Sequence, residues 1–272
     1  MKTQLSMDEI KAIELSILIE FDKYCANNNL TYFLCGGTLL GCIRHKGFIP
    51  WDDDIDVFMP RKDYEKFYEL TSKSPMRKNL ISSTYRSKKN TIPYPFIKII
   101  DNTTEVIEQG KNTRKNNGIW IDVLPLDVLP EDDTENADIF SKMKELRKKL
   151  FFAFTEVTIN NSKNLLTYIY KKVKQFFAKK CIHSICKKMD ILSQNYSDLD
   201  TGFAGCLLWG LYGKGERVER EVFEIDKGSF ENKEFNIPKG WDRYLKGIYG
   251  NYMELPPVEK RQTHSLLAYR LM

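Results

Sequence analysis

The chain has 272 residues, 42% of them hydrophobic, and a formal net charge of +5, which suits one large domain or a catalytic domain with a smaller appendage. Its six cysteines form no CxxC pair and its three histidines lie far apart, which argues against disulfide dependence and against a zinc site. The sequence has no run of about 18 apolar residues and no signal peptide pattern, so we expect a cytoplasmic protein.

The N-terminal residues predict a helix, a short strand and a glycine turn. Ser6 and Glu9 have the spacing of a capping box, and apolar residues recur after them at helical spacing. A β-prone run then ends at Gly36 and Gly37, and Thr38 opens a second helix. The backbone N–H groups of such a turn can bind a phosphate, with the Thr38 hydroxyl as a further donor. A glycine pair alone is equally typical of an ordinary turn.

Acidic residues are concentrated in the segment WDDDIDV, residues 51–57. Asp54 and Asp56 lie two apart on a predicted strand, so both side chains point to one face, and Asp52 can join them. Like charges this close raise one another's pKa unless a cation neutralises them, and carboxylates favour Mg²⁺ or Mn²⁺ over zinc. A solvated acidic turn is the alternative, but the apolar neighbours of these acids favour a metal site.

Two other kinds of site share part of this pattern. A calcium-binding loop would need a glycine where Val57 stands and a bidentate glutamate where Asp63 stands. A metal-dependent glycosyltransferase would place a nucleotide-binding half of about a hundred residues before its acids. Only about fifty residues precede the acids in this chain, so we rank both alternatives lower.

A third acid is expected from a later strand. Further β-prone runs lie at 96–100, 105–107 and 119–124, and a helix is predicted over 63–71. Asp122 lies inside the last of these runs and would be costly to bury without a metal or hydrogen bonds, so we expect it to meet Asp54 and Asp56. Asp127 is interpreted as a loop acid or a helix cap.

These patterns together predict an α/β (α+β) fold, with a small mixed sheet flanked by helices. Residues 1–130 are expected to form the catalytic core and 131–195 a basic helical segment. The remaining residues, 196–272, are rich in glycine, proline and aromatic residues, and we expect an irregular region that completes the substrate site.

The order of these features resembles the nucleotidyltransferase fold, in which a strand-end Gly-Gly-Thr precedes an acidic strand and a later single acid. The segment FLCGGTLLGCIRHKGFIPWDDDIDVFMPRKDYEKF is similar to the LicD family, which includes bacterial phosphocholine transferases and animal fukutin-related proteins. The resemblance extends to IPKGWDRYLKGIYGNYMELPP and to His264 near the end of the chain.

The resemblance implies transfer of phosphocholine from CDP-choline to a hydroxyl of a cell-surface polysaccharide or its lipid-linked precursor, with release of CMP. Ribitol or glycerol phosphate from its own CDP donor is the alternative. Asp54 and Asp56 would hold Mg²⁺ or Mn²⁺ against the diphosphate, while Asp122 completes the site and helps to deprotonate the acceptor hydroxyl. Asp52 would bind metal or orient its neighbours.

Other contacts to the substrates are assigned from residue type. Arg44 and Lys98 are candidates for the donor phosphates, although a single cation is as often a surface residue. Choline carries a quaternary ammonium, which aromatic rings attract by about 1 to 2 kcal/mol when it is desolvated. The candidates for choline or acceptor contacts are Tyr94, Trp120, Trp209, Tyr212 and His264.

The basic stretch KKVKQFFAKKCIHSICKKM, residues 171–189, predicts an amphipathic helix. It could contact an anionic membrane that carries a lipid-linked acceptor, or pack its apolar face on the core with its lysines in water. A nucleic-acid-binding protein would use the same lysines but would leave the acidic site unexplained, so nucleic acid is not an expected partner.

Overall fold

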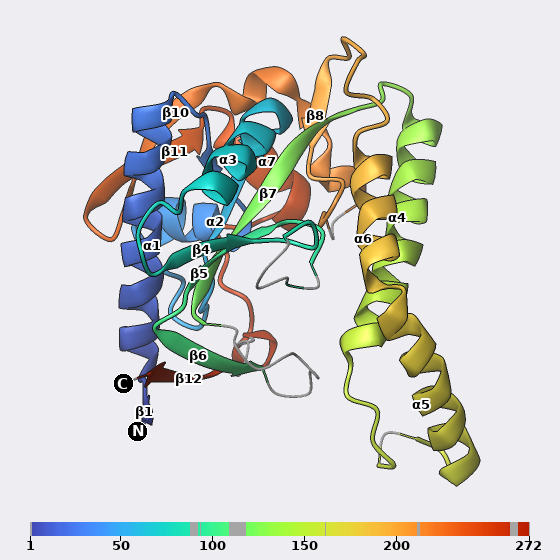
Figure 1. Ribbon diagram of the computed structural model, residues 1–272. Coiled ribbons are helices and arrows are strands. Elements are labelled where there is room, and N and C mark those ends of the chain that lie inside the picture. The colour runs from blue at the N-terminus through green and yellow to red at the C-terminus, as the bar shows by residue number, and fades with distance from the viewer. Residues whose placement is uncertain are drawn as a thin grey trace.

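The computed structural model describes residues 2–87, 92, 94–108, 118–160, 162–210, 213–261 and 266–271. Within these residues the chain forms a mixed α/β fold around a central sheet. In Figure 1, helix α1 lies along the left side of this sheet, and α4 and α6 lie to its right. The fold class predicted from the sequence is confirmed.

Helix α1 (Met7–Asn28) begins at the predicted capping box. The Glu9 N–H donates to Ser6 Oγ (3.3 Å), and the Ser6 N–H donates to Glu9 Oε2 (2.8 Å). This reciprocal pairing satisfies two backbone N–H groups at the helix start. The helix ends at Asn29, whose φ of 52° is a left-handed conformation that asparagine tolerates.

Five strands form the path of the central sheet, in the order β2, β3, β7, β5, β4. Their bounds are Phe33–Leu34, Asp56–Pro60, Trp120–Leu129, Ile97–Asp101 and Leu80–Ser83. Helix α2 (Gly36–Arg44) connects β2 to β3, and α3 (Arg61–Lys73) follows β3. β3 and β7 run parallel, whereas the other neighbours on this path are antiparallel. The parallel pair aligns the acidic start of β3 with Asp122.

Strand β7 continues past Leu124, where the sequence predicts its end. Its partner on one side changes along its length, because β5 pairs with residues 120–123 and β8 (Phe203–Gly205) pairs with residues 127–129. Pro125 lies between these two paired stretches, so neither β5 nor β8 pairs with it, and the N–H that proline lacks is not needed for a hydrogen bond to them. Asp127 therefore lies inside the strand, and its interpretation as a loop acid or cap is wrong.

The C-terminal region is more regular than its glycine and proline content predicts. It contains β9 (Val218–Glu219), β10 (Ile225–Phe230), β11 (Lys233–Pro238), α7 (Trp241–Tyr249) and the 3₁₀ helices η1 (Gly213–Glu216), η2 (Arg220–Phe223) and η3 (Val258–Lys260). β10 and β11 form a hairpin whose two turn residues, Glu231 and Asn232, both have positive φ. Such turns usually carry Asn-Gly, so this hairpin has a weak sequence signal. The Glu231 carboxylate accepts the Phe48 N–H (3.0 Å), which fixes the turn.

The two ends of the chain meet in a second sheet. β1 (Lys2–Gln4) and β6 (Thr104–Glu108) pair antiparallel with opposite edges of β12 (Leu266–Leu271). Figure 1 accordingly shows both termini close together at the lower left.

The basic helical segment consists of α4 (Asp133–Phe154), α5 (Leu165–Lys180) and α6 (Ile182–Ser193). α4 and α6 pack side by side, and α5 projects from their lower end (Figure 1). Within the described ranges, none of the helices is both long and apolar enough to span a membrane.

A buried ion-pair network joins α6 to the core. The Arg61 guanidinium on α3 donates to both carboxylate oxygens of Asp127 (2.7 and 2.9 Å) and to Asp190 on α6 (3.0 Å). The Tyr85 hydroxyl donates to the second oxygen of Asp190 (2.8 Å). The Asp127 side chain is fully buried, so its charge depends on this arginine.

Candidate active site

The two glycines at the start of α2 lie directly beneath carboxylates. Gly36 has a φ of 52°, and a β-carbon there would lie 3.6 Å from Asp56 Oδ2. A β-carbon on Gly37 would lie only 2.6 Å from Asp52 Oδ2, closer than carbon and oxygen can approach. The glycine pair therefore serves to bring Asp52 and Asp56 against the N-terminus of α2, whose partial positive charge favours anions.

Thr38 fixes the beginning of β3. Its hydroxyl oxygen accepts the backbone N–H of Asp56 (2.8 Å), and its side chain is buried. The Asp56 carbonyl in turn accepts the N–H of Cys35, immediately before α2. These two hydrogen bonds lock the acidic strand to the glycine turn. The structure thus shows Thr38 in a positioning contact, whereas its predicted contact with a phosphate stays a prediction.

Asp56 and Asp122 are directly opposite each other on the parallel strands β3 and β7. The Asp122 N–H donates to the Ile55 carbonyl (2.8 Å), which sets this register. Asp54 lies just before β3 and lines the same cavity as Asp52 and Asp56. The sequence prediction that a later strand brings Asp122 to Asp56 is confirmed, whereas a shared site with Asp54 stays a prediction.

The acidic cluster is short of positive charge. Burial raises the pKa of Asp56 well above its usual range, and the charges of Asp54, Asp122 and Asp52 raise it further, opposed by Lys98. A divalent cation would relieve this repulsion. As the side chains stand, however, no three His, Cys, Asp or Glu residues of the described ranges are placed to share one metal ion.

Lys98 forms an ion pair with Asp122 and is surrounded by aromatic rings. Its Nζ lies 2.7 and 3.1 Å from the two oxygens of Asp122. The same ammonium lies 4.0 Å from the ring centroid of Trp120 and 4.7 Å from that of Tyr94. Two of the aromatic residues considered for choline therefore already contact a cation of the protein itself.

A cavity of about 340 Å³ opens beside the acidic cluster. One part of its lining is formed by the glycine turn and the acids, Gly36, Gly37, Asp52, Asp54 and Asp56. Another part is aromatic and comes from β3, α7 and the segment after β8, namely Phe58, Trp209, Tyr244 and Tyr249. The carboxylate-bearing residue Glu216 also borders it. The cavity therefore brings a glycine turn and three aspartate carboxylates together with aromatic rings.

Comparison with known families and proteins shows the family to which the chain belongs. The family model described as "LicD/FKTN/FKRP, nucleotidyltransferase domain" matches residues 29–180. This range includes the glycine turn and the acids Asp52, Asp54, Asp56 and Asp122. The chain belongs to the LicD family.

Individual relatives extend the match over almost the whole chain. The chain is 26% identical to the lipopolysaccharide cholinephosphotransferase LicD of Haemophilus influenzae, with 97% of each chain covered. An uncharacterised protein of Rickettsia typhi is 36% identical over 32% of this chain, and one of Rickettsia prowazekii is 39% identical over 20%. The first of these alignments reaches the C-terminal residues that line the cavity.

Several residues considered as substrate contacts lie elsewhere or outside the described ranges. Arg44 donates to the carbonyl oxygens of Tyr252 (2.5 Å) and Glu254 (3.2 Å) and does not line the cavity. It therefore holds the segment after α7 in place in this structure. Tyr212 and His264 lie outside the described residues.

Sequence reasoning identified Trp209 as a candidate but missed the other polar and aromatic cavity residues of the C-terminal region. Tyr244 and Tyr249 come from α7, within the LicD-like segment WDRYLKGIYG, and Glu216 comes from η1. The spacing of Tyr244, Ile248 and Tyr249 on one helical face was the available signal. Glu216 had none, because it follows an aromatic segment without regular periodicity.

Glu14 on α1 is a further acid that the sequence analysis missed. It is almost fully buried, and it occupies a position of the helix face otherwise formed by Ile10, Ile17 and Phe21. Burial raises the pKa of Glu14 well above its usual range, and the charges of the neighbouring acids Asp54, Asp53 and Asp52 raise it further. The available signal was an acidic residue at a helix position where the spacing of the apolar residues predicts an apolar one.

Replacement of this acid by its neutral isostere, Glu14→Gln, is expected to stabilise the protein increasingly as pH rises. A carboxyl whose pKa is raised in the folded state contributes stability below its unfolded pKa, and that contribution is lost as pH rises toward the folded pKa. The wild-type free energy of unfolding should fall by up to about 1.4 kcal/mol per pH unit from this group, and the variant should lack this slope. Urea unfolding with EDTA between about pH 5 and pH 8 measures both. Parallel pH profiles for the two proteins would contradict the assignment.

Proposed function

We propose that the protein transfers phosphocholine from CDP-choline to a hydroxyl of a cell-surface polysaccharide or its lipid-linked precursor and releases CMP. The observation that carries this proposal is the cavity, in which the glycine turn, the acids and the aromatic lining meet. The end-to-end similarity to a lipopolysaccharide cholinephosphotransferase supports the same substrate class.

The reaction exchanges one phosphorus–oxygen bond for another. The acceptor hydroxyl oxygen forms a bond to the phosphorus that carries choline, the bond from that phosphorus to the CMP oxygen breaks, and the hydroxyl proton leaves. Asp122 is not itself part of the cavity lining, but it pairs with the lining residue Asp56 across the two strands, and Lys98 orients its carboxylate, so we assign it as the group that receives this proton. The glycine turn at the N-terminus of α2 is suited to hold an anionic donor.

The donor set of the site fits a hard divalent cation in its chemistry, because it consists of carboxylates. Asp52, Asp54 and Asp56 border the cavity and would hold Mg²⁺ or Mn²⁺, with Asp122 opposite Asp56 as the further ligand. When bound, the cation would offset the charge of the donor diphosphate and of the departing CMP. Burial raises the pKa of Asp56 and the neighbouring acids raise it further, and the negative charge of these neighbours supports a cation at the site.

The aromatic lining supports choline as the transferred alcohol. Trp209, Tyr244 and Tyr249 face the cavity that contains the acids, and Glu216 adds a carboxylate among them. A quaternary ammonium offers no hydrogen-bond donor, so ring faces and a negative charge are the groups that recognise it. Ribitol and glycerol would instead require hydrogen-bonding partners for their hydroxyls.

A comparison of donors tests the proposed function. The protein is incubated with Mg²⁺, a glycan acceptor and either CDP-choline, CDP-glycerol or CDP-ribitol, and CMP release is followed. We expect release with CDP-choline, dependent on the acceptor and abolished by EDTA. Turnover only with CDP-glycerol or CDP-ribitol would show that the transferred alcohol is a polyol and not choline. Full activity in EDTA would show that the reaction needs no divalent metal.

The substitution Trp209→Leu is expected to weaken binding of CDP-choline selectively. Loss of one ring face against the choline ammonium should raise KM for CDP-choline by about 5 to 30-fold, with a much smaller effect on kcat. Trp241→Leu provides a matched control, because Trp241 is half-buried and does not line the cavity. Steady-state kinetics measures both variants. An unchanged KM for CDP-choline in Trp209→Leu would exclude this ring from choline binding.

A further inference from the structure

Helix α5 exposes an apolar face that no other part of the described protein covers. Seven large apolar side chains on this helix are exposed, with exposed fractions between 49% for Ile169 and 78% for Leu166. They are Leu165, Leu166, Ile169, Tyr170, Val173, Phe176 and Phe177. The basic stretch 171–189 thus forms parts of two helices, and packing of its apolar face on the core is wrong for α5 but correct for α6, where Ile185 and Met189 are buried. So large an apolar surface on one helix marks an interaction site.

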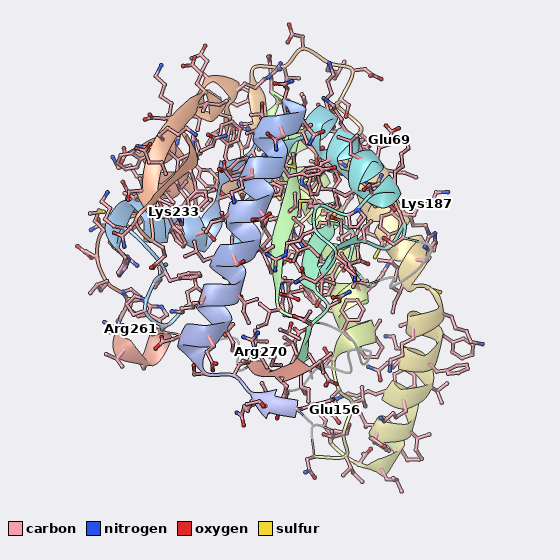
Figure 2. The ribbon with its side chains drawn as sticks, turned by 60° about the vertical axis from the view of Figure 1, so that its left-hand side comes forward. Glu69, Glu156, Lys187, Lys233, Arg261 and Arg270 are labelled. Carbon is pink, nitrogen blue, oxygen red and sulfur yellow. The ribbon has the colours of Figure 1, made fainter. Side chains whose placement is uncertain are left out.

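The orientation of α5 is fixed by one buried side chain. Gln175 is the buried residue of the helix, and its amide donates to the carbonyl oxygens of Phe152 (3.0 Å) and Thr155 (2.5 Å) at the end of α4. At about 100° per residue, the seven apolar residues lie within an arc of about 140° on the side opposite Gln175. Figure 2 shows α5 at the lower right of the molecule, extending away from the central sheet.

Positive charge accompanies this apolar face. α5 contains five lysines and no acidic residue, and on the helical projection Lys172, Lys174 and Lys179 flank the apolar arc. Lysines in this position can extend their ammonium groups toward lipid phosphates while their stems stay beside apolar side chains. A second copy of the chain, docked face to face on α5, would instead bring lysines against lysines without an opposing acid.

We propose that α5 binds in the headgroup layer of an anionic membrane, with its apolar face among the acyl chains and its lysines at the lipid phosphates. An anionic lipid surface supplies both the apolar layer and the negative charge that this helix requires. The helix would lie in the plane of the membrane, which needs no spanning segment.

The attachment of α5 places the membrane beside the candidate active site. Near the end of α4 to which Gln175 is bound, Phe151 lies 5.3 Å from Trp209 between ring centroids, and Trp209 lines the cavity. Phe154 on the same turn contacts Tyr94 (5.5 Å). A helix bound to the membrane surface would therefore hold the cavity close to a lipid-linked acceptor. This consequence rests on the proposed function, whereas the membrane contact itself does not.

Vesicle co-sedimentation tests the membrane contact without relying on catalysis. The full chain is mixed with phosphatidylcholine vesicles, with or without about one third phosphatidylglycerol, at low and high salt. We expect binding to the anionic vesicles that weakens with salt. The double variant Leu166→Ser/Phe177→Ser should bind at least about 10-fold more weakly, and so should Lys172→Gln/Lys174→Gln.

Ile225→Ser/Val258→Ser is the matched control, because both side chains are large, apolar and exposed but lie outside α5. It should bind vesicles as the wild type does. All variants should release CMP at wild-type rates with a water-soluble acceptor, so a failure of the proposed transferase activity would be seen separately in that assay. Equal binding by the α5 variants, no vesicle binding at all, or a dimer in sedimentation velocity that the α5 variants dissociate would each overturn the proposal.

Discussion

The substitution Asp56→Asn should lower kcat for CMP release by at least about 10³-fold, the magnitude typical for loss of a group that stabilises charge at a reacting centre. Asp56 lies where the glycine turn, strand β3 and Asp122 meet. The carboxylates of Asp52 and Asp54 come from positions before the strand, so they cannot take its place. Steady-state assays with CDP-choline and Mg²⁺ measure the effect.

The same substitution should leave the fold intact. Because burial and neighbouring acids raise the pKa of Asp56, its removal relieves repulsion, and the free energy of unfolding in EDTA should stay equal or increase. Asp226→Asn, an exposed position on β10, serves as the control and should change neither property. Activity of Asp56→Asn within about 10-fold of the wild type would exclude this carboxylate from the reacting centre.

Arg61→Met should destabilise the protein by about 3 to 5 kcal/mol, because it leaves the fully buried Asp127 without its partner. Burial raises the pKa of Asp127 and Arg61 opposes that rise, so loss of the arginine should raise this pKa further. A raised folded-state pKa disfavours the charged form, so the destabilisation should be larger at neutral pH than at acidic pH. Urea unfolding at several pH values measures it.

Two variants separate the charge effect from lost packing. Arg61→Met/Asp127→Asn removes the uncompensated charge and should recover part of the lost stability. Arg243→Met removes an arginine whose ion pair with Glu219 is exposed, and it should cost no more than about 1 kcal/mol. If Arg61→Met cost as little as Arg243→Met, the buried network would not be what joins α6 to the core.

The sequence carried enough local information to predict the first half of the site. The capping box at Ser6 and Glu9 and the glycine turn act through backbone geometry over a few residues, and both are found in the structure. The placement of Asp54 on the same strand as Asp56 was wrong, because β3 begins only at Asp56. The meeting of Asp56 with Asp122 was predictable, because a carboxylate inside an apolar strand is costly to bury unless a metal or hydrogen bonds compensate it.

Other features depend on contacts between distant segments and had no local signal. The Glu231-Asn232 hairpin forms although it lacks the usual Asn-Gly, and β7 passes through Pro125 because its neighbours change there. Likewise, nothing in the sequence indicated that aromatic rings surround Lys98 in the folded protein.

The orientation of α5 is the clearest example of this limit. Its sequence pattern is equally typical of a helix packed on a core and of a helix on a membrane. Only the hydrogen bonds of Gln175 to the end of α4 show which face is turned inward. The periodicity of a helix gives its two faces, whereas tertiary contacts decide what each face meets.

The most direct test of the account is transfer of choline label from CDP-choline to a purified glycan acceptor, measured together with CMP release by the wild type and by Asp56→Asn. The account predicts that label appears in the glycan in equal amount to CMP with the wild type, and that the variant produces neither. Release of CMP at the same rate without an acceptor, with no label in the glycan, would contradict transfer and show hydrolysis of the donor instead.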